Sequence, residues 1–211
     1  MEPEAFSADA ASEDEAAPVG PEDEKRASTY GLLGALLARP PGAEVLEALR
    51  GIEAGGQAEG DMAPTWDMLR LAAGYATTEG LDDEYHELFI GISRGELVPY
   101  GSWYLTGFMM DRPLAYLRRD LQQLGIERQA GVAEPEDHAS ALCEAMAVII
   151  SSAPELDAGA QREFFQQHVA PWMGLFFKDL QQARAANFYR AVGRLGEQFI
   201  EFERRYLAMS G

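Results

Sequence analysis

The stretch FYRAVGRLGEQFIEFERRY, residues 188 to 206, carries the clearest structural signal in the chain. Its large apolar residues recur at alternating steps of four and three, and they are Phe188, Val192, Leu195, Phe199, Phe202 and Tyr206. This spacing places one apolar stripe along an α-helix, like the seam of a coiled coil. We therefore predict a long amphipathic helix that packs against other helices.

Similar helical spacing of apolar residues recurs through most of the chain. The segments that show it are 28–38, 43–50, 62–76, 81–92, 114–124, 134–150, 157–168 and 171–184. Ala and Leu dominate over Val and Ile, and unbranched side chains lose little rotamer freedom in a helix. We predict an all-α protein, a single globular helical domain of about eight or nine helices. Ser28 and Thr29 are the expected cap of the first helix.

An aromatic stretch with several glycines interrupts this pattern. Residues 93 to 110 hold Pro99, Tyr100, Trp103 and Tyr104 among three glycines, a composition that breaks helices. We predict a loop that connects an N-terminal half, ending near residue 92, to a C-terminal half over 111–211. Packing into the seam between the halves is the simplest interpretation of each ring. Rings on a Pro-containing loop are also suited to anchor an apolar peptide.

The chain is strongly acidic, with a formal net charge of −18. Residues 1–24 contain nine acids and no Lys or Arg, so 26 acids and 17 bases, a net −9, remain for the rest. A segment so rich in charge and poor in apolar residues cannot offset its ordering entropy. We therefore expect residues 1–25 to be a disordered tail and 26–211 to form the helical domain. The negative surface repels phosphates, so we expect no nucleic-acid partner.

Neither a membrane segment nor a cofactor signature is evident. No apolar run is long enough to span a bilayer and no basic region precedes one at the start, so we expect a cytoplasmic protein without stable membrane insertion. Cys143 lies in a predicted helix and is expected in the core. The sequence contains no phosphate-loop, dinucleotide, zinc-protease or paired C-x-x-C motif. We expect no catalytic residue, no bound metal and no cofactor.

An acid-rich cluster precedes His138. Glu134, Glu136 and Asp137 are expected in the first turn of a helix, where carboxylates complement the positive helix end. Acids with a histidine also suit a metal ion. An alternative hypothesis is therefore a metal- or nucleotide-dependent helical protein that uses Asp137 and His138. A third hypothesis is an adaptor that recruits a folded partner through the acidic tail.

Four short motifs occur together over roughly residues 28–207. They are Glu84-Tyr85-x-x-Leu88-Phe89, Pro99-Tyr100-Gly101-Ser102-x-Tyr104, Glu134-Pro135-Glu136-Asp137-His138, and Pro171-Trp172 followed by Phe188-Tyr189. In this order they resemble the signature of the TorD/DmsD/NarJ group of redox-enzyme maturation chaperones. The resemblance implies an all-helical, non-catalytic cytoplasmic chaperone. Such a protein binds the twin-arginine signal peptide and apo form of a molybdopterin-containing oxidoreductase subunit, aids cofactor insertion and delays export until folding is complete.

The resemblance also implies which residues bind the leader. These are Tyr85, Leu88, Phe89, Pro99, Tyr100, Asp137 and His138. A leader with two guanidinium groups and an apolar stretch needs carboxylates beside an apolar groove. Trp103 and Tyr104 are added as candidate rings, and Glu136, with Glu84 and Glu87, as candidate carboxylates. The client, nucleotide binding and the oligomeric state stay open, since a monomer and a domain-swapped dimer are both compatible with the sequence.

Overall fold

The computed structural model describes residues 6–8, 19–52, 62–91, 95–128, 134–152, 156 and 159–209. The all-α fold is confirmed, because these residues form ten α-helices, two π-helical turns and one pair of short strands. The chain divides into two compact units. Unit 1 consists of Met1–Ala38 and Tyr100–Trp172, and unit 2 of Arg39–Pro99 and Met173–Gly211. Each unit thus joins an early segment to a late one, which differs from the expected sequential halves.

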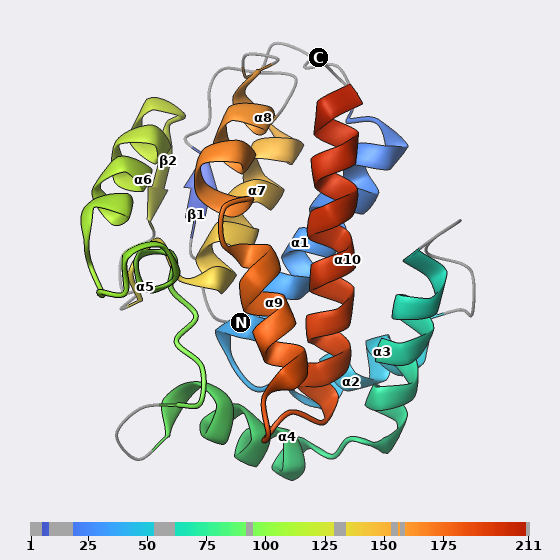
Figure 1. Cartoon of the computed structure of the whole chain (residues 1–211). Helices are drawn as coiled ribbons and strands as arrows, with labels where there is room; N and C mark the ends of the chain where they lie inside the picture. Colours follow the sequence, from blue (N-terminus) through green and yellow to red (C-terminus); the bar gives the residue numbers. More distant parts are fainter. Residues whose placement is uncertain are drawn as a thin grey trace. The chain divides into compact units, whose positions relative to one another are not determined.

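Unit 1 is built on the pairing of α1 (Pro21–Ala38) with α7 (Ala139–Ser151), which lie side by side in Figure 1. α8 (Ala160–Phe164) and the π-helical turn η3 (Phe165–Val169) also contact α7. α6 (Arg112–Gln123) contacts α5 (Gly101–Thr106) and β2 (Ile126–Arg128). β2 pairs with β1 (Phe6–Ala8) in antiparallel register, Phe6 opposite Arg128. Cys143 of α7 is fully buried, as expected for a core residue.

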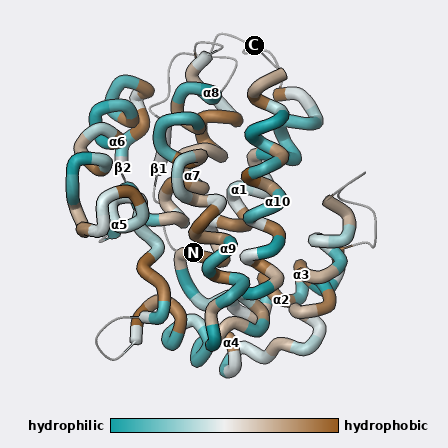
Figure 2. The backbone as a smooth tube through the Cα atoms, viewed as in Figure 1, coloured by the Kyte–Doolittle hydropathy of each residue, from teal (hydrophilic) through white to brown (hydrophobic). Residues whose placement is uncertain are grey.

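Unit 2 is built on α10 (Phe188–Met209), which packs against α9 (Met173–Gln182) and α3 (Ala63–Tyr75). α2 (Ala43–Arg50) contacts α3, and α4 (Thr78–Tyr85) continues into the π-helical turn η2 (His86–Ile90). The stripe predicted for α10 is confirmed from Phe188 to Phe199, since Val192 and Leu195 have no exposed surface and Phe199 is buried. In the last turns the predicted Phe202 and Tyr206 are half-buried, and Glu203 and Leu207 are buried instead. Figure 2 shows hydrophilic and hydrophobic residues alternating along this helix, as its amphipathic sequence requires.

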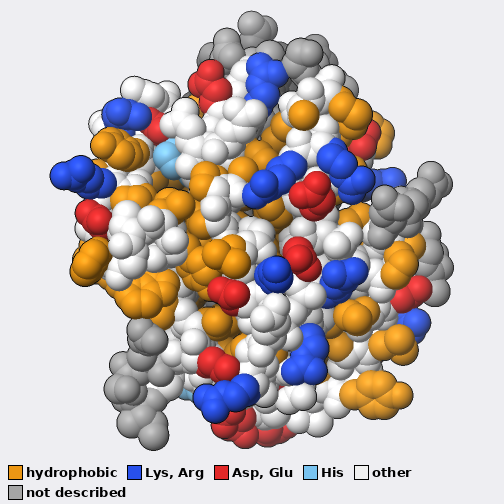
Figure 3. Space-filling model, viewed as in Figure 1, with side chains coloured by type: hydrophobic (Ala, Val, Ile, Leu, Met, Phe, Trp, Pro, Cys, Tyr) orange, Lys and Arg blue, Asp and Glu red, His pale blue; other side chains and the backbone are white. Residues whose placement is uncertain are grey.

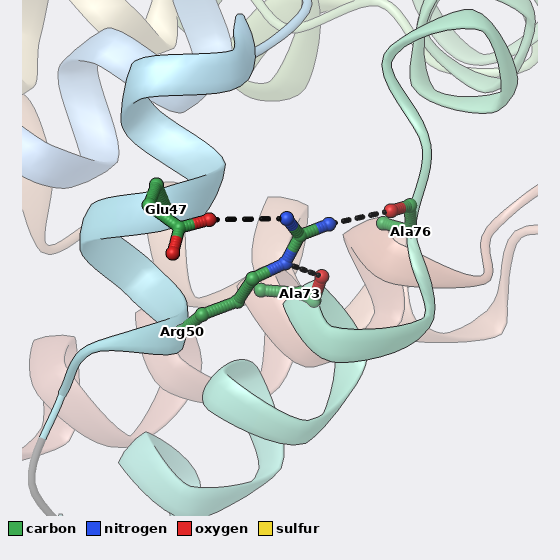
Figure 4. A network of polar contacts seen from close by, with 4 residues as sticks. All are labelled: Glu47, Arg50, Ala73 and Ala76. Atoms are coloured by element: carbon green, nitrogen blue, oxygen red, sulfur yellow. Dashed lines mark hydrogen bonds and ion pairs between the residues drawn. The ribbon is translucent and has the colours of Figure 1, made fainter.

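Arg50 joins the end of α2 to the end of α3 (Figure 4). Its Nε donates to the carbonyl of Ala73 and its Nη2 to the carbonyl of Ala76, both at 2.9 Å. The same guanidinium forms an ion pair with Glu47 at 3.3 Å. The last carbonyls of a helix have no partner within the helix, so Arg50 supplies donors that α3 itself lacks.

Two boundaries at the N-terminal side differ from the prediction. α1 begins at Pro21, so Thr29 is not a cap but lies inside the helix, where its Oγ1 donates to the carbonyl of Lys25 at 2.8 Å. The helix starts earlier because Pro suits a first-turn position and the acids that follow it complement the positive helix end. Part of the expected disordered tail is therefore structured, as β1 and the start of α1. Residues 1–5 and 9–18 lie outside the described residues.

Two further boundaries concern the aromatic stretch and the acid-rich cluster. Residues 101–106, expected within a loop, form the short helix α5. α7 begins at Ala139, so the acids at 134, 136 and 137 precede the helix instead of occupying its first turn. Residues 92–94, where the first half was expected to end, lie outside the described residues.

None of the helices in the described ranges combines the length and the hydropathy needed to cross a bilayer.

Candidate functional site

Asp137 holds the first turn of α5 in place. The N–H of Gly101 donates to the main-chain carbonyl of Asp137 at 2.8 Å, and the N–H of Ser102 donates to Oδ2 of its side chain at 2.8 Å. The Ser102 hydroxyl donates to the same oxygen. The first N–H groups of a helix have no partner within the helix, so these bonds explain why a glycine-containing aromatic stretch becomes helical.

The second carboxylate oxygen of Asp137, Oδ1, takes no part in these bonds. Oδ1 is buried and has no hydrogen-bond partner among the described residues, although the side chain is only 3% exposed. A buried polar atom without a partner costs free energy, so such atoms are rare and call for a ligand or a water.

This carboxylate belongs to the wall of a cavity of about 410 Å³ in unit 1. The other residues that line the cavity are Gly101, Leu105, Pro113, Tyr116, Leu117, Arg119, Leu142, Gln167, His168 and Trp172. Most of these walls are apolar. The Arg119 guanidinium is engaged by Asp120 at 2.8 Å. The cavity is the candidate functional site, because it combines apolar walls with an incompletely bonded carboxylate.

His138 acts as the N-terminal cap of α7. Its Nδ1 accepts from the N–H of Ser140 at 3.2 Å and lies 2.6 Å from the Ser140 hydroxyl. Its ring meets the Tyr100 ring edge to face, with centroids 4.9 Å apart. Burial lowers the pKa of His138 to about 4, although the carboxylates of Glu134 and Asp137 act in the opposite direction. The imidazole is therefore neutral near pH 7 and serves as a cap.

His168 and Trp172 also line the cavity. Nε2 of His168 lies 2.9 Å from Oδ2 of Asp120, and the Trp172 indole N–H donates to the His168 carbonyl at 2.8 Å. Burial lowers the pKa of His168, and the ion pair with Asp120 opposes that shift. A Cβ on Gly101 would lie 3.1 Å from the Trp172 indole nitrogen. Glycine at 101 thus lets the indole reach the start of α5.

Six of the ten predicted site residues lie in unit 1, and of these only Asp137 lines the cavity. The Tyr100 hydroxyl donates to Glu134, and the Tyr104 ring packs on Trp172 with centroids 5.4 Å apart. Glu136 forms an ion pair with Arg118 at 2.8 Å. Trp103 is half-buried on α5 and His138 caps α7.

The other four predicted residues lie in unit 2. Tyr85 and Phe89 form an aromatic cluster with Tyr189, with centroid distances of 5.0, 6.0 and 5.5 Å for the three pairs. Leu88 has no exposed surface and Pro99 is buried, so both side chains are placed to support packing.

Glu84 has a structural role in place of the expected contact with a guanidinium. Its carboxylate accepts from the N–H groups of Asn187, Phe188 and Tyr189 at 2.8, 3.1 and 2.8 Å, at the start of α10. Glu96 accepts from the two N–H groups of Arg184 and Ala185 in the turn before it. Sequence reasoning missed this role, since the bonds join residues 103 to 105 positions apart.

The comparison with protein families decides the affiliation of the chain. The model of the family described as nitrate reductase delta subunit matches residues 57–178, more than half of the chain. The chain belongs to this family. Together with the similar proteins named TorD and DmsD, this match confirms the predicted affiliation with redox-enzyme maturation chaperones.

Relatives in the same family carry chaperone names. The chaperone protein TorD of Vibrio cholerae is 27% identical over 133 residues, 59% of this chain and 60% of that protein. The chain thus spans less than two thirds of that relative. TorD of Shewanella pealeana is 25% identical over 209 residues, 90% and 92% of the two chains. DmsD of Haemophilus influenzae, named as a Tat proofreading chaperone, is 29% identical over 119 residues, 56% and 57% of the two chains.

A solved structure shares the fold. It is described as a redox enzyme maturation protein from Archaeoglobus fulgidus and aligns with a TM-score of 0.51 at 18% identity, covering 90% of this chain and 99% of that one. Membership of a chaperone family agrees with the expectation of a protein without catalysis.

The alternative of a metal-dependent family member gains no support from the acid-rich cluster. Within the described ranges, no three His, Cys, Asp or Glu side chains come together as a metal-binding group. The Asp137 carboxylate accepts from the N–H of Ser102, and Nδ1 of His138 lies within hydrogen-bond distance of the Ser140 hydroxyl. Ser102, Arg119, His168 and Trp172 are parts of the site that sequence reasoning did not select as site residues. Two of them, Ser102 and Trp172, stand within the family motifs, which was the one signal available for them.

Proposed function

We propose that this protein is a cytoplasmic chaperone of a molybdopterin-containing oxidoreductase subunit. It binds the twin-arginine leader and the apo form of its client, aids cofactor insertion and delays export until folding is complete. The names of its relatives TorD and DmsD support this class of client. The observation that carries the proposal is Asp137, which lines a largely apolar cavity and has a buried Oδ1 without a hydrogen-bond partner.

An arginine side chain matches that cavity. Its guanidinium presents a rigid fork of N–H donors, and one of these gives Oδ1 the hydrogen bond that it lacks. Its aliphatic part suits the apolar walls around the carboxylate. Charge-assisted hydrogen bonds to a buried carboxylate are stronger than neutral ones, so an arginine is bound more tightly than an amide of similar size.

Catalysis gains no comparable support from the same residues. His138 is held neutral as a helix cap, and burial raises the pKa of the Cys143 thiol, which leaves it protonated and unreactive. The second predicted function, a nucleotide- or metal-dependent protein, is therefore not carried forward. Tyr85, Phe89 and Pro99 remain predicted leader contacts of unit 2.

The proposal is tested by the affinity of a synthetic leader peptide for Asp137→Asn. The amide oxygen still accepts from Ser102, so α5 keeps its support, while an amide group replaces the free oxygen. We expect binding to weaken by about 1.5 to 3 kcal/mol, the cost of losing a charged acceptor. Isothermal titration calorimetry gives the affinity, and a melting curve confirms that the variant is folded.

Two controls give the test its specificity. Glu163→Gln removes an exposed carboxylate of α8 in the same unit and is expected to leave the affinity unchanged. A leader with Gln-Gln in place of Arg-Arg is expected to bind weakly to the wild-type protein. Equal binding of the Arg-Arg leader by the wild-type protein and by Asp137→Asn would show that the cavity does not hold the arginine.

A further inference from the structure

The exposed apolar side chains of unit 1 are concentrated in one place. Among the described residues of this unit, every exposed large hydrophobic side chain lies between residues 105 and 116. These are Leu105, Phe108, Met109, Met110 and Tyr116, with exposed fractions of 42, 71, 41, 70 and 54%. Figure 3 shows hydrophobic side chains gathered over the α5 region of this face. We name these five residues the apolar strip. Contiguous apolar surface of this kind marks an interaction site.

The apolar strip is continuous with the cavity that contains Asp137. Leu105 and Tyr116 line the cavity and are also exposed at the surface. Phe108, Met109 and Met110 follow Leu105 directly in the turn between α5 and α6. A ligand bound in the cavity at Asp137 therefore has the strip beside it where it leaves the protein.

The turn that presents the strip has a defined backbone. Gly107 and Met110 have φ angles of 81° and 56°, in the left-handed region that non-glycine residues rarely adopt. The Thr106 hydroxyl accepts from the N–H of Phe108 at 3.3 Å, and the Asp111 carboxylate accepts from the N–H of Arg112 at 2.7 Å. These bonds fix both ends of the turn. A left-handed methionine is strained, and such strain is retained mainly at functional positions.

We propose that the apolar strip binds the apolar segment that follows the arginine pair of a client leader. The inference rests on the proposed function and deepens it. The occupant follows from charge complementarity: the cavity carboxylate takes the cationic part of the peptide, so the residues next in the peptide meet the strip. An apolar helix offers side chains at steps of three and four to such a surface. Flexible methionines adapt to different apolar sequences, which suits leaders of varied composition.

The test separates the two parts of the leader. The long probe is a fluorescein-labelled peptide with Arg-Arg followed by roughly 14 residues of Leu and Ala, about four helical turns. The short probe carries Arg-Arg without the apolar segment. The variant is Phe108→Ser with Met110→Asn, since Asn tolerates the left-handed backbone. The matched control is Leu71→Ser with Tyr75→Ser, which removes two exposed apolar side chains of α3 in unit 2.

We expect the strip variant to bind the long probe at least about tenfold more weakly, as for two anchoring side chains of an interface. Its affinity for the short probe should stay within roughly twofold of the wild type, since that probe has no apolar segment to contact the strip. The control variant should bind both probes like the wild type. Fluorescence anisotropy measures the affinities of the wild-type protein, the strip variant and the control variant for both probes.

The outcomes distinguish the inference from the function on which it rests. If the wild-type protein binds neither probe, the proposed function fails. If the wild-type protein binds the long probe and the strip variant binds it equally well, the inference fails and the proposed function stands. If the strip variant keeps the long probe but shifts a dimer to a monomer in sedimentation, the strip contacts a second copy of the chain, and the inference is overturned.

Discussion

Asp137 and His138 are adjacent in the chain but have separate tasks. Oδ2 of Asp137 supports α5 through Ser102, and its Oδ1 is left for a ligand. His138 caps α7 through Ser140. One residue of the family motif thus faces the cavity while the next one maintains the helix beside it. A variant at either position affects stability unless the replacement keeps the structural bond.

His138→Asn keeps the structural bond and removes the titration. The Asn side-chain oxygen accepts from Ser140, as Nδ1 does, and Asn is a preferred N-terminal cap. In the folded wild-type protein the pKa of His138 is lowered from 6.5 to about 4. The unfolded chain therefore binds more protons than the folded protein between these pH values. Acidification favours the unfolded chain, so the contribution of neutral His138 to the free energy of unfolding is complete above pH 6.5 and is lost as the pH falls toward 4.

The expected difference is measurable by urea unfolding. Between pH 7 and pH 5 the wild-type protein should lose about 2 kcal/mol more of its free energy of unfolding than His138→Asn. Urea titrations at the two pH values give both numbers, and Glu163→Gln serves as a variant with the wild-type pH dependence. An identical loss in the wild type and His138→Asn would mean that His138 is not held neutral in the folded state.

The candidate site could be predicted from sequence only in part. A family motif predicts Asp137 as a site residue, and the structure places it in the wall of the cavity. The division of its two oxygens was not accessible, because Ser102 lies 35 residues away and no local pattern indicates the pairing. For the same reason Glu84 was assigned to a ligand, although its carboxylate binds the start of α10.

At the scale of elements, the first N–H groups of two helices donate to carboxylates from distant segments of the chain. Asp137 accepts at the start of α5, and Glu84 accepts at the start of α10. The period of apolar residues identified α10, whose stripe runs over 19 residues, from 188 to 206. It missed α5, because six residues are too few to display a period and the stability of the helix comes from Asp137. Arg50 stabilises the end of α3 in a comparable way, through donors from α2.

Glu84→Gln tests the anchoring of α10. One amide oxygen cannot replace two carboxylate oxygens, and the amide group of Gln meets an N–H donor where an acceptor is needed. The side chain is buried, so water does not compensate. We expect the free energy of unfolding to fall by about 1 to 3 kcal/mol, the cost of leaving a buried donor unsatisfied. Urea unfolding at pH 7 measures it. Glu87→Gln, an exposed neighbour, should change stability by less than about 0.5 kcal/mol, and an equal effect of the two variants would refute the anchor.

At the scale of the whole molecule, the sequence indicated the helices better than their grouping. The chain passes between units at 38–39, 99–100 and 172–173. A stripe such as that of α10 states that a helix has a buried face but not which helix covers it. Sequential halves are therefore the default prediction, whereas each unit combines two segments that are separated in the sequence. The middle passage falls inside the motif that starts at Pro99.

The acidic character of the chain leads to a prediction about the speed of leader capture. A net charge of −18 attracts a cationic leader, and exposed charges act mainly on the association rate. Neutralising the six acids of residues 1–18 as amides changes the net charge to −12, because −18 plus 6 gives −12, and leaves Phe6–Ala8 unaltered.

We expect association of an Arg-Arg leader to slow by roughly two- to threefold at low ionic strength, since surface charge accelerates encounter. At about 1 M salt the Debye length falls to about 3 Å and the two proteins should associate at the same rate. Stopped-flow fluorescence at both salt concentrations measures the rates. The dissociation rate should not change, because the proposed binding site of the arginine is at Asp137 and not in the acidic segment. A large increase in dissociation that persists at high salt would instead identify the acidic segment as a binding site in its own right, which is the outcome expected of an adaptor.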